Sequence, residues 1–257
     1  MNKKIIEARH IKKVYGKKGE KQHEALTDIS FDVLAGEFVG IMGPSGSGKT
    51  TLLNILSALD SPTSGEIEIS GASLNGLTDN QLSDFRAQKI GFIFQDFNLL
   101  ENLTMSQNIG LPLSLKGESV KETKNKIKNI AKILDIERIL TSYPTEVSGG
   151  QKQRVAAARA LVHNPDLLLG DEPTGALDSK NAKNLLEALK GLNEDYLTTI
   201  LLVTHDAVSA SYCKRILFIQ DGLIYRELHR RGTQQAFYQE ILAVLAGLEI
   251  DPEESQV

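Results

Sequence analysis

A short glycine-rich stretch, residues 43–51, constrains this sequence more than any other. It reads Gly-Pro-Ser-Gly-Ser-Gly-Lys-Thr-Thr and fits the spacing G-x-x-x-x-G-K-[ST] of a phosphate-binding loop. The glycines let the backbone curl tightly and bring its N–H groups close to a bound phosphate. Lys49 adds a positive charge for the β- and γ-phosphates, and the Thr50 hydroxyl can ligate Mg²⁺. The predicted phosphate ligands are Gly43, Pro44, Ser45, Gly46, Ser47, Gly48, Lys49, Thr50 and Thr51.

The residues on either side of this loop give the motif the context that it requires. Residues 37–42 form a short apolar run typical of a strand, and residues 52–58 carry the apolar pattern of a helix. A strand, a phosphate loop and a helix in this order indicate an α/β fold with a P-loop NTPase core. The helix would direct its positive end at the bound anion, so we expect a nucleotide here.

Two adjacent carboxylates, Asp171 and Glu172, follow the apolar run of residues 167–170. Side chains alternate along a strand, so the two acids point in different directions and can have different roles. Asp171 would reach Mg²⁺ directly or through water, and Glu172 would polarise an attacking water as general base or positioner. An acidic turn without a catalytic role is the alternative, and the phosphate loop in the same α/β core disfavours it.

Ser148, Gly149, Gly150 and Gln151 form a second candidate anion site. A serine cap followed by glycines leaves backbone N–H groups free at the positive end of a helix, which we expect to run to about His163. The phosphate loop already serves the nucleotide, so one interpretation is that Ser148 faces the γ-phosphate held by another subunit. An ordinary capped helix is the other interpretation.

The charge and the cysteine content exclude some classes of protein. The chain has 257 residues, a net charge of −4 and a pI of about 5.8, so no overall basic field attracts nucleic acid. The single cysteine, Cys213, excludes an internal disulfide and fits a reducing compartment. The N-terminus lacks the apolar segment of a signal peptide, and no apolar run approaches the ~18 residues of a membrane span. We expect a protein that is cytosolic or held at a membrane by a partner.

The order of patterns predicts strands and helices along the chain. Strands over residues 4–16, 25–33 and 66–70 indicate an antiparallel β portion. Later strands at residues 167–171, 198–204 and 215–220 alternate with a helix over 179–193, capped by Ser179, and this alternation predicts a parallel sheet.

The middle of the chain predicts a helical insertion. Residues 99–115 are apolar but irregular, with Pro112 as a breaker, and residues 120–140 read as a helix whose lysines form a solvated face. A last helix over residues 233–250 places Phe237, Ile241, Leu245 and Leu248 on one apolar face. The predicted domains are a nucleotide-binding α/β core of residues 1–95 and 165–232, a helical subdomain of residues 96–164, and a C-terminal helix and tail of residues 233–257.

The chain resembles the ATP-binding-cassette (ABC) ATPases, whose signature motif is the Ser-Gly-Gly-Gln of residues 148–151. The resemblance covers roughly residues 5–228, nearly the whole chain, with every expected motif in order. It implies that Tyr15 stacks on adenine, that Gln95 contacts Mg²⁺ or the lytic water, and that His205 contacts the γ-phosphate. Residues 175–178 match the loop that crosses to the other subunit in this family.

The same resemblance implies cofactors, catalytic residues and a subunit arrangement. ATP and Mg²⁺ are the implied cofactors, with Thr50, Gln95 and Asp171 at the metal and Glu172, His205 and Gln95 as catalytic residues. Two copies would form a head-to-tail homodimer in which residues 148–151 of one chain face the ATP of the other. In this family, ATP binding closes the dimer and hydrolysis reopens it.

Further motifs narrow the resemblance to a group. Residues 91–100, 108–113 and 171–179 are similar to macrolide-export, lipoprotein-release and peptide-antibiotic-resistance ATPases. Residues 148–159, with Lys152 as the main clue, and residues 210–213 and 218–222 most resemble the bacitracin and lantibiotic resistance type of Gram-positive bacteria. That type implies an integral-membrane permease with a large extracellular domain, which often works with a sensor histidine kinase.

The resemblance leaves alternatives for what ATP hydrolysis drives. A soluble ABC ATPase acting on DNA or ribosomes is less favoured, because the chain has one cassette, a short insertion and an acidic charge, and we expect no nucleic-acid partner. A macrolide-export, lipoprotein-release or amino-acid-import system is the other alternative. We expect the protein at the cytoplasmic face of the cell membrane, held by its permease. The candidate groove for the permease includes Phe97, Leu99, Leu100 and Leu103, and the alternative is that these residues are simply the core of the hinge.

Overall fold

A computed structural model gives the fold, and it describes residues 3–16, 19 and 21–249. Residues 17, 18 and 20 and the end of the chain from residue 250, including the last residue of the helix predicted over 233–250, lie outside this part of the chain. The chain forms two compact units, which are described separately: Met1–Gly76 with Leu201–Val257, and Leu77–Ile200. Within the described ranges, no helix has the length and apolar character that a membrane span requires.

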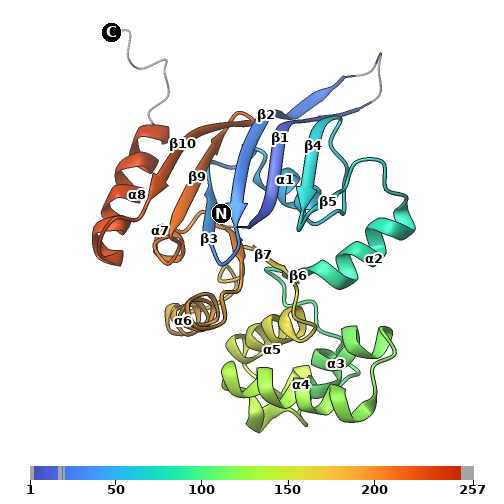
Figure 1. Cartoon of the computed structure of the whole chain (residues 1–257). Helices are drawn as coiled ribbons and strands as arrows, with labels where there is room; N and C mark the ends of the chain where they lie inside the picture. Colours follow the sequence, from blue (N-terminus) through green and yellow to red (C-terminus); the bar gives the residue numbers. More distant parts are fainter. Residues whose placement is uncertain (1–2, 17–18, 20, 250–257) are drawn as a thin grey trace, which may run out of the picture. The chain divides into compact units, whose positions relative to one another are not determined.

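The first unit, built from both ends of the chain, is a β-rich layer with three helices among its described residues (Figure 1). The strand order within it is β5-β4-β1-β2-β10-β9-β3-β8. Its strands are β1 (Lys4–Tyr15), β2 (His23–Leu34), β3 (Phe38–Met42), β4 (Ser64–Ile69), β5 (Ala72–Ser73), β8 (Ile200–Val203), β9 (Arg215–Gln220) and β10 (Leu223–His229), and its helices are α1 (Lys49–Leu56), α7 (Ala207–Ala210) and α8 (Gln234–Glu249).

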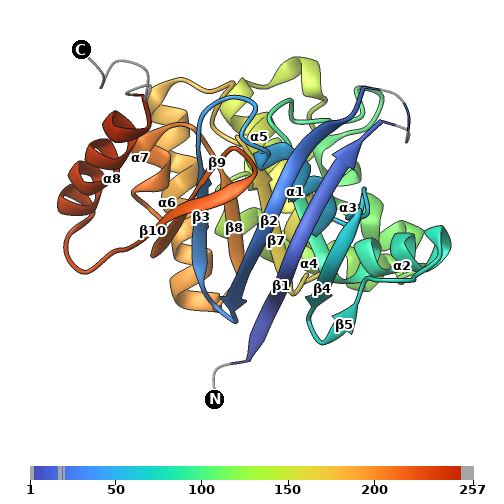
Figure 2. The same cartoon turned by 90° about the horizontal axis from the view of Figure 1, so that it is seen from above.

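The pairing of these strands confirms the predicted mixture of antiparallel and parallel portions. β1 pairs antiparallel with both β2 and β4, which Figure 2 shows side by side, while β3 pairs parallel with β9. Every residue of β3 is buried, as expected of a strand covered on both faces. The phosphate loop therefore begins directly after a central strand, at the carboxyl end where α/β proteins bind their ligands.

The C-terminal helix α8 packs against α7 in this unit. Phe237 and Ile241 are buried, as the apolar pattern predicted, and Val244 is buried with them. Leu245 and Leu248 are only partly covered. The helix thus covers its own unit with part of the predicted apolar face.

The second unit, Leu77–Ile200, pairs two parallel strands and carries the helices of the middle of the chain. Helices α3, α4 and α5 pack on one another, as Figure 1 shows in green and yellow. Its elements are α2 (Asp79–Lys89), β6 (Ile90–Ile93), α3 (Met105–Leu115), α4 (Val120–Ile133), the 3₁₀ turns η1 (Glu137–Ile139) and η2 (Pro144–Glu146), α5 (Gly149–Leu161), β7 (Leu167–Asp171) and α6 (Ser179–Tyr196).

Several predictions about this unit are wrong in detail. The irregular stretch that Pro112 was expected to break is the helix α3, which begins at a capping box of Thr104 with Gln107 and keeps Pro112 inside. The helix predicted over residues 120–140 ends at Ile133, because Asp135 adopts a left-handed φ of 52°. The cap of α6 is Asp178, not Ser179. The predicted division into a core, a helical subdomain and a C-terminal helix stays a prediction.

Candidate functional site

The phosphate loop is held by close backbone contacts that require its glycines. A Cβ at Gly43 would lie 2.0 Å from the Ile219 carbonyl oxygen of β9. Gly48 has a φ of +103°, and a Cβ there would lie 2.5 Å from the Ala25 carbonyl oxygen of β2. Real Cβ atoms do not approach a carbonyl so closely, so both positions need glycine for packing as well as for loop curvature.

The turn between β9 and β10 forms a hydrogen bond with the phosphate loop. Gly222 donates its N–H to the Ser47 carbonyl at 3.2 Å, and accepts from the Thr27 N–H at 2.9 Å. Ser47 is itself buried. The loop is therefore bonded to the β9–β10 turn, which is itself bonded to β2.

Lys49 and the start of α1 provide the positive end of this half of the site. Lys49 donates its Nζ protons to the carbonyls of Gly43 at 2.9 Å and Pro44 at 2.7 Å, so its ammonium already lies across the loop. Gly48 caps α1 without a side-chain hydrogen bond, and the first turn of α1 carries no acidic residue. A helix N-terminus without a side-chain cap or an acidic residue is favourable for a bound anion.

Tyr15 and His205 belong to the same unit as the phosphate loop, but they lie at the ends of other strands. Tyr15 is the last residue of β1 and pairs with His23, close to the Ala25 carbonyl that Gly48 approaches. His205 is exposed and follows β8, whose neighbour Thr204 donates its N–H to the Ile41 carbonyl of β3. The phosphate loop and His205 therefore follow neighbouring strands, β3 and β8, whereas Tyr15 ends β1, which β2, β10 and β9 separate from β3.

The second unit holds the two predicted carboxylates. Asp171 ends β7, and Glu172 follows it with a φ of 44°, a left-handed conformation that costs a non-glycine residue roughly 1–3 kcal/mol. The Gly175 N–H donates to the Glu172 carbonyl at 2.9 Å and closes the turn. This turn separates the two acids, because it redirects Glu172 away from the strand that carries Asp171.

Gln95 lies against this turn. A Cβ built at Gly175 would be 3.2 Å from Gln95 Nε2 and 3.3 Å from the Glu172 carbonyl oxygen. Three residues selected separately from the sequence, Gln95, Glu172 and Gly175, are therefore neighbours in the structure.

Gln153 is a residue of this site that the sequence analysis missed. It is fully buried on α5, and its Nε2 donates to the Phe94 carbonyl at 3.0 Å and to the Pro173 carbonyl at 2.7 Å. Phe94 precedes Gln95, and Pro173 follows Glu172. One side chain of the signature helix thus ties together the backbone beside both predicted catalytic residues. Its position, two residues after Gln151 in a helix whose other buried residues are glycine or apolar, was the available signal.

The signature residues form a capping box at the start of α5. Ser148 Oγ accepts from the Gln151 N–H at 3.3 Å, and Gln151 Oε1 accepts from the Ser148 N–H at 2.9 Å. Ser148 is exposed and keeps its hydroxyl proton for an anion, since its oxygen serves as the acceptor. The first turn of α5 contains no acidic residue, so the N-terminus remains favourable for negative charge.

The loop of residues 175–178 is coupled to this signature. Asp178 caps α6 by accepting from the Asn181 N–H at 2.9 Å and from its side-chain amide at 2.6 Å, and these bonds lower the pKa of the Asp178 carboxyl. A Cβ at Gly150 would lie 2.2 Å from Asn181 Oδ1, so α5 and α6 meet at this glycine. Residues 148–151 and 175–178 therefore form one connected surface.

The segment that follows Gln95 is held by Arg159 of α5. The Arg159 guanidinium donates to the Asn98 carbonyl at 2.6 Å and to the Phe97 carbonyl at 3.0 Å. Phe97 and Asn98 both have positive φ values, 35° and 50°. A planar guanidinium can satisfy two such carbonyls at once, so α5 fixes this strained turn as well as the signature.

These features define the class of protein, and the comparisons agree. The family described as ABC transporter matches residues 26–175, more than half of the chain. The chain belongs to this family and is one of its ATP-binding subunits, an ABC ATPase.

Individual relatives are similar over nearly their full length. The chain is 51% identical to the ABC transporter ATP-binding protein YxdL of Bacillus subtilis, over 95% of this chain and 94% of that protein. It is 50% identical to the bacitracin export ATP-binding protein BceA of Halalkalibacterium halodurans, over 96% and 99%. The dimeric post-hydrolysis structure of the cassette MJ0796 of Methanocaldococcus jannaschii, bound to ADP and Pi, matches with a TM-score of 0.80, 43% identity, and coverage of 89% and 100%.

Proposed function

We propose that the chain is the motor subunit of a bacterial transporter for resistance to, or sensing of, peptide antibiotics. In this proposal two copies form a head-to-tail homodimer on the cytoplasmic face of the cell membrane, held there by a separate permease. The main structural support for ATP hydrolysis is the cluster of Gln95, Glu172 and Gly175. Gln153 of the signature helix bonds to the backbone beside Gln95 and Glu172. Similarity to BceA along almost all of both chains supports the peptide-antibiotic assignment.

Each site residue has a role in this proposal. The loop of residues 43–51 binds the phosphates, Tyr15 stacks on adenine, and His205 contacts the γ-phosphate. Glu172 polarises the attacking water, which Gln95 helps to place. The signature residues Ser148, Gly149, Gly150 and Gln151 act on the ATP held by the other chain, whose γ-phosphate they receive at the N-terminus of α5.

Mg²⁺ fits the donor set of this chain. Thr50, Asp171 and Gln95 offer oxygen atoms, the hard ligands that Mg²⁺ prefers. Among the described residues, no cluster of three or more His, Cys, Asp or Glu side chains could hold a metal by itself. This suits Mg²⁺, which takes few protein ligands and completes its shell with phosphate oxygens and water. When bound, the ion would neutralise phosphate charge during hydrolysis.

The substitution Glu172→Gln tests the proposed mechanism. The amide keeps the size of the side chain but cannot act as a base, so we expect ATP binding to persist and turnover to fall about 10²- to 10⁴-fold. The variant should also accumulate as a dimer in Mg-ATP, measured by gel filtration with light scattering. Turnover equal to that of the unmodified chain would overturn the assignment of Glu172.

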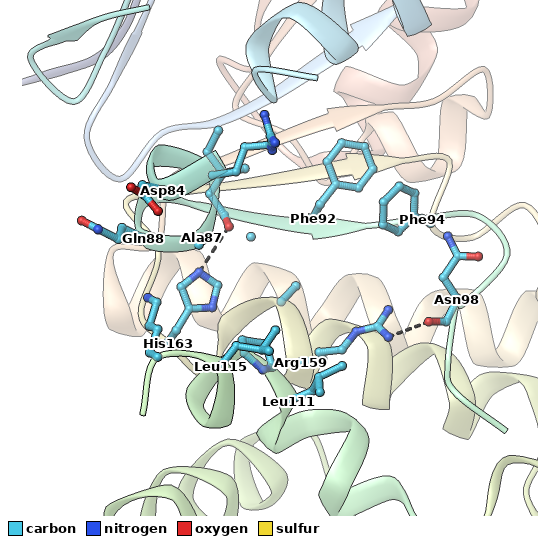
Figure 3. A pocket seen from close by; sticks show the side chains of 16 residues that line it. Asp84, Ala87, Gln88, Phe92, Phe94, Asn98, Leu111, Leu115, Arg159 and His163 are labelled. Carbon is cyan, nitrogen blue, oxygen red and sulfur yellow. Dashed lines mark hydrogen bonds between the residues drawn. The ribbon is translucent and has the colours of Figure 1, made fainter. Parts of the chain in front are cut away.

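A cavity in the second unit is the proposed docking site of the permease. Its volume is about 680 Å³, and Figure 3 shows Phe92 and Phe94 on one side and Leu111 and Leu115 on the other. Asn98 is part of its lining, whereas Phe97, Leu99, Leu100 and Leu103 are not. The cavity therefore lies beside the segment of Phe97 to Leu103 that the sequence analysis chose as the groove. Of the four apolar residues chosen there, only Leu100 is strongly exposed.

The cavity also offers polar recognition. His163 Nε2 lies 3.2 Å from the Ile90 carbonyl and must donate to it, which leaves Nδ1 as an acceptor. Nδ1 is buried and has no partner among the described residues. Burial lowers the pKa of His163 and keeps the ring neutral. The expected occupant is a short apolar segment of the permease, which would pack on the aromatic and leucine side chains of the cavity.

Leu115→Asp, with Val120→Asp as a matched control, tests this docking site. Both side chains are strongly exposed, 81% and 72%, but only Leu115 lines the cavity. We expect Leu115→Asp to lose co-purification with the permease while Val120→Asp retains it, with both keeping basal ATPase activity. Normal co-purification of Leu115→Asp would contradict the assignment.

The identity of the permease that co-purifies with the chain also distinguishes the alternative functions. A permease of the macrolide-export or lipoprotein-release type would identify the runner-up function, and the absence of any permease would favour a cassette acting on DNA or ribosomes. A peptide-resistance permease that brings a sensor histidine kinase with it would support the signalling role.

A further inference from the structure

Three side chains next to the proposed adenine site form a compact polar cluster. Lys13 and Tyr15 lie two residues apart on β1, and Asp60 lies in the turn between α1 and β4. Lys13 Nζ donates to Asp60 Oδ1 at 2.5 Å and to the Ser61 carbonyl at 2.7 Å. The Tyr15 hydroxyl donates to Asp60 Oδ2 at 2.9 Å. Both carboxylate oxygens of Asp60 are therefore used within the cluster.

The same lysine also covers the tyrosine ring. Lys13 Nζ lies over the ring of Tyr15, 4.9 Å from its centroid, at a distance where a cation is attracted by the π-electrons. The Lys13 side chain is only 12% exposed and that of Asp60 29%, whereas Tyr15 is 39% exposed. Lys13 is thus largely buried and Asp60 partly buried, whereas Tyr15 is an exposed residue.

We infer that Lys13 and Asp60 are positioning residues for base recognition, which lock the Tyr15 ring so that adenine stacks on the face opposite Lys13. This inference rests on the proposed role of Tyr15. An ammonium on one face of the ring leaves the other face for the base. The hydroxyl bond to Asp60 fixes the rotation of the ring, so that little side-chain freedom is lost when the base binds.

The charges of Lys13 and Asp60 offset each other within the cluster. Asp60 neutralises Lys13, so this lysine is unavailable as a further phosphate ligand, in contrast to Lys49. Burial raises the pKa of Asp60, but the hydrogen bonds from Lys13, Tyr15 and the Ser61 N–H outweigh it, and the pKa lies below its ordinary value. The carboxylate is consequently ionised at neutral pH, and both of its bonds persist there.

The experiment compares ATP with inorganic tripolyphosphate, which has phosphates but no base. The full chain and its variants Lys13→Met and Asp60→Asn are titrated with each compound and Mg²⁺ by calorimetry. We expect both variants to bind ATP roughly tenfold more weakly, because the tyrosine must now be ordered on binding, and to bind tripolyphosphate unchanged. Lys12→Met is the matched control, because Lys12 pairs with Glu24 instead.

A third variant separates this inference from the role of Tyr15. Tyr15→Ala should weaken ATP binding by itself, and Lys13→Met should add nothing in that background, since the lysine acts through the ring. If Tyr15→Ala leaves ATP affinity unchanged, the proposed stacking residue is wrong and the inference fails with it. If Tyr15→Ala weakens ATP but Lys13→Met has the same effect with and without Tyr15, only the inference is overturned. Equal weakening of ATP and tripolyphosphate would also overturn it, because that result indicates general unfolding of the loop.

Discussion

At the scale of single residues, a comparison of Gly46 with Gly48 distinguishes the effect of backbone strain from that of packing in the phosphate loop. Both have positive φ, +80° and +103°, but a Cβ at Gly46 would meet nothing within 4 Å, whereas one at Gly48 would meet the Ala25 carbonyl. Replacing either with alanine adds strain of roughly 1–2 kcal/mol. Only at Gly48 does a steric conflict with the backbone of β2 add to it.

We therefore expect Gly48→Ala to lower the free energy of unfolding by about 1–3 kcal/mol more than Gly46→Ala does. Urea denaturation of the nucleotide-free protein measures this difference directly. Gly46→Ala serves as the control, because it makes the same chemical change in the same loop. Equal losses for the two variants would show that the contact with Ala25 is unimportant.

The residue types of this loop were predictable, but their contacts were not. The spacing of Gly43, Gly48 and Lys49 defines the motif within a few positions of the chain. The contacts of Gly43 with Ile219 and of Gly48 with Ala25 join residues far apart in sequence. No local pattern encodes such distant neighbours, so the packing reason for these glycines emerges only from the folded structure.

At the scale of elements, α5 connects the signature to the catalytic strands through Gln153. Gln153→Leu would leave the Phe94 and Pro173 carbonyls without this donor, a loss of about 2 kcal/mol or more in the free energy of unfolding. The turns carrying Gln95 and Glu172 would also shift. We expect kcat to fall roughly ten- to hundredfold, with KM for ATP little changed because the phosphate loop belongs to other elements.

Steady-state kinetics and urea denaturation measure these two effects. Gln235→Leu is the matched control, since it makes the same change at an exposed position of α8 and should stay within about 0.5 kcal/mol of the unmodified chain. A normal kcat in Gln153→Leu would show that the signature helix does not position the catalytic turns.

The elements that the sequence predicted poorly share a physical cause. α2 buries none of its residues, so it carries no apolar periodicity to detect, and only its Thr78–Gln81 capping box marks its start. α3 contains Pro112, yet its Thr104 cap and the buried Met105, Ile109 and Leu113 outweigh the lost hydrogen bond. β10 is largely exposed and was missed for a related reason. Helix caps and strand pairing, rather than apolar periodicity, determine where these elements form.

At the scale of the whole molecule, the central claim is that each ATP is shared by two chains. Ser148 is exposed at a helix N-terminus that has no acidic residue in its first turn, as expected of an anion-binding surface. Lys49 and the start of α1 offer the other half from a separate part of the chain. The claim assigns these two halves of one site to different copies.

The chain is well suited to test this by thiol cross-linking. Its only cysteine, Cys213, is fully buried, and burial raises the pKa of its thiol, so it is unreactive. Single cysteines can be placed by Ser45→Cys in the phosphate loop and by Val147→Cys beside the signature, each in a Glu172→Gln background that retains ATP. Val147 is not a predicted site residue, whereas Ser45 is a predicted phosphate ligand, so ATP binding by the Ser45→Cys chain is measured before cross-linking.

The decisive measurement is the covalent heterodimer formed when these two chains, each with one added cysteine, are mixed with Mg-ATP and a short bifunctional thiol reagent. The account predicts a cross-linked heterodimer in the mixture with ATP, none without ATP, and none from either chain alone. A chain carrying both Ser45→Cys and Val147→Cys that cross-links only within itself, while the mixture yields no heterodimer, would contradict the shared site.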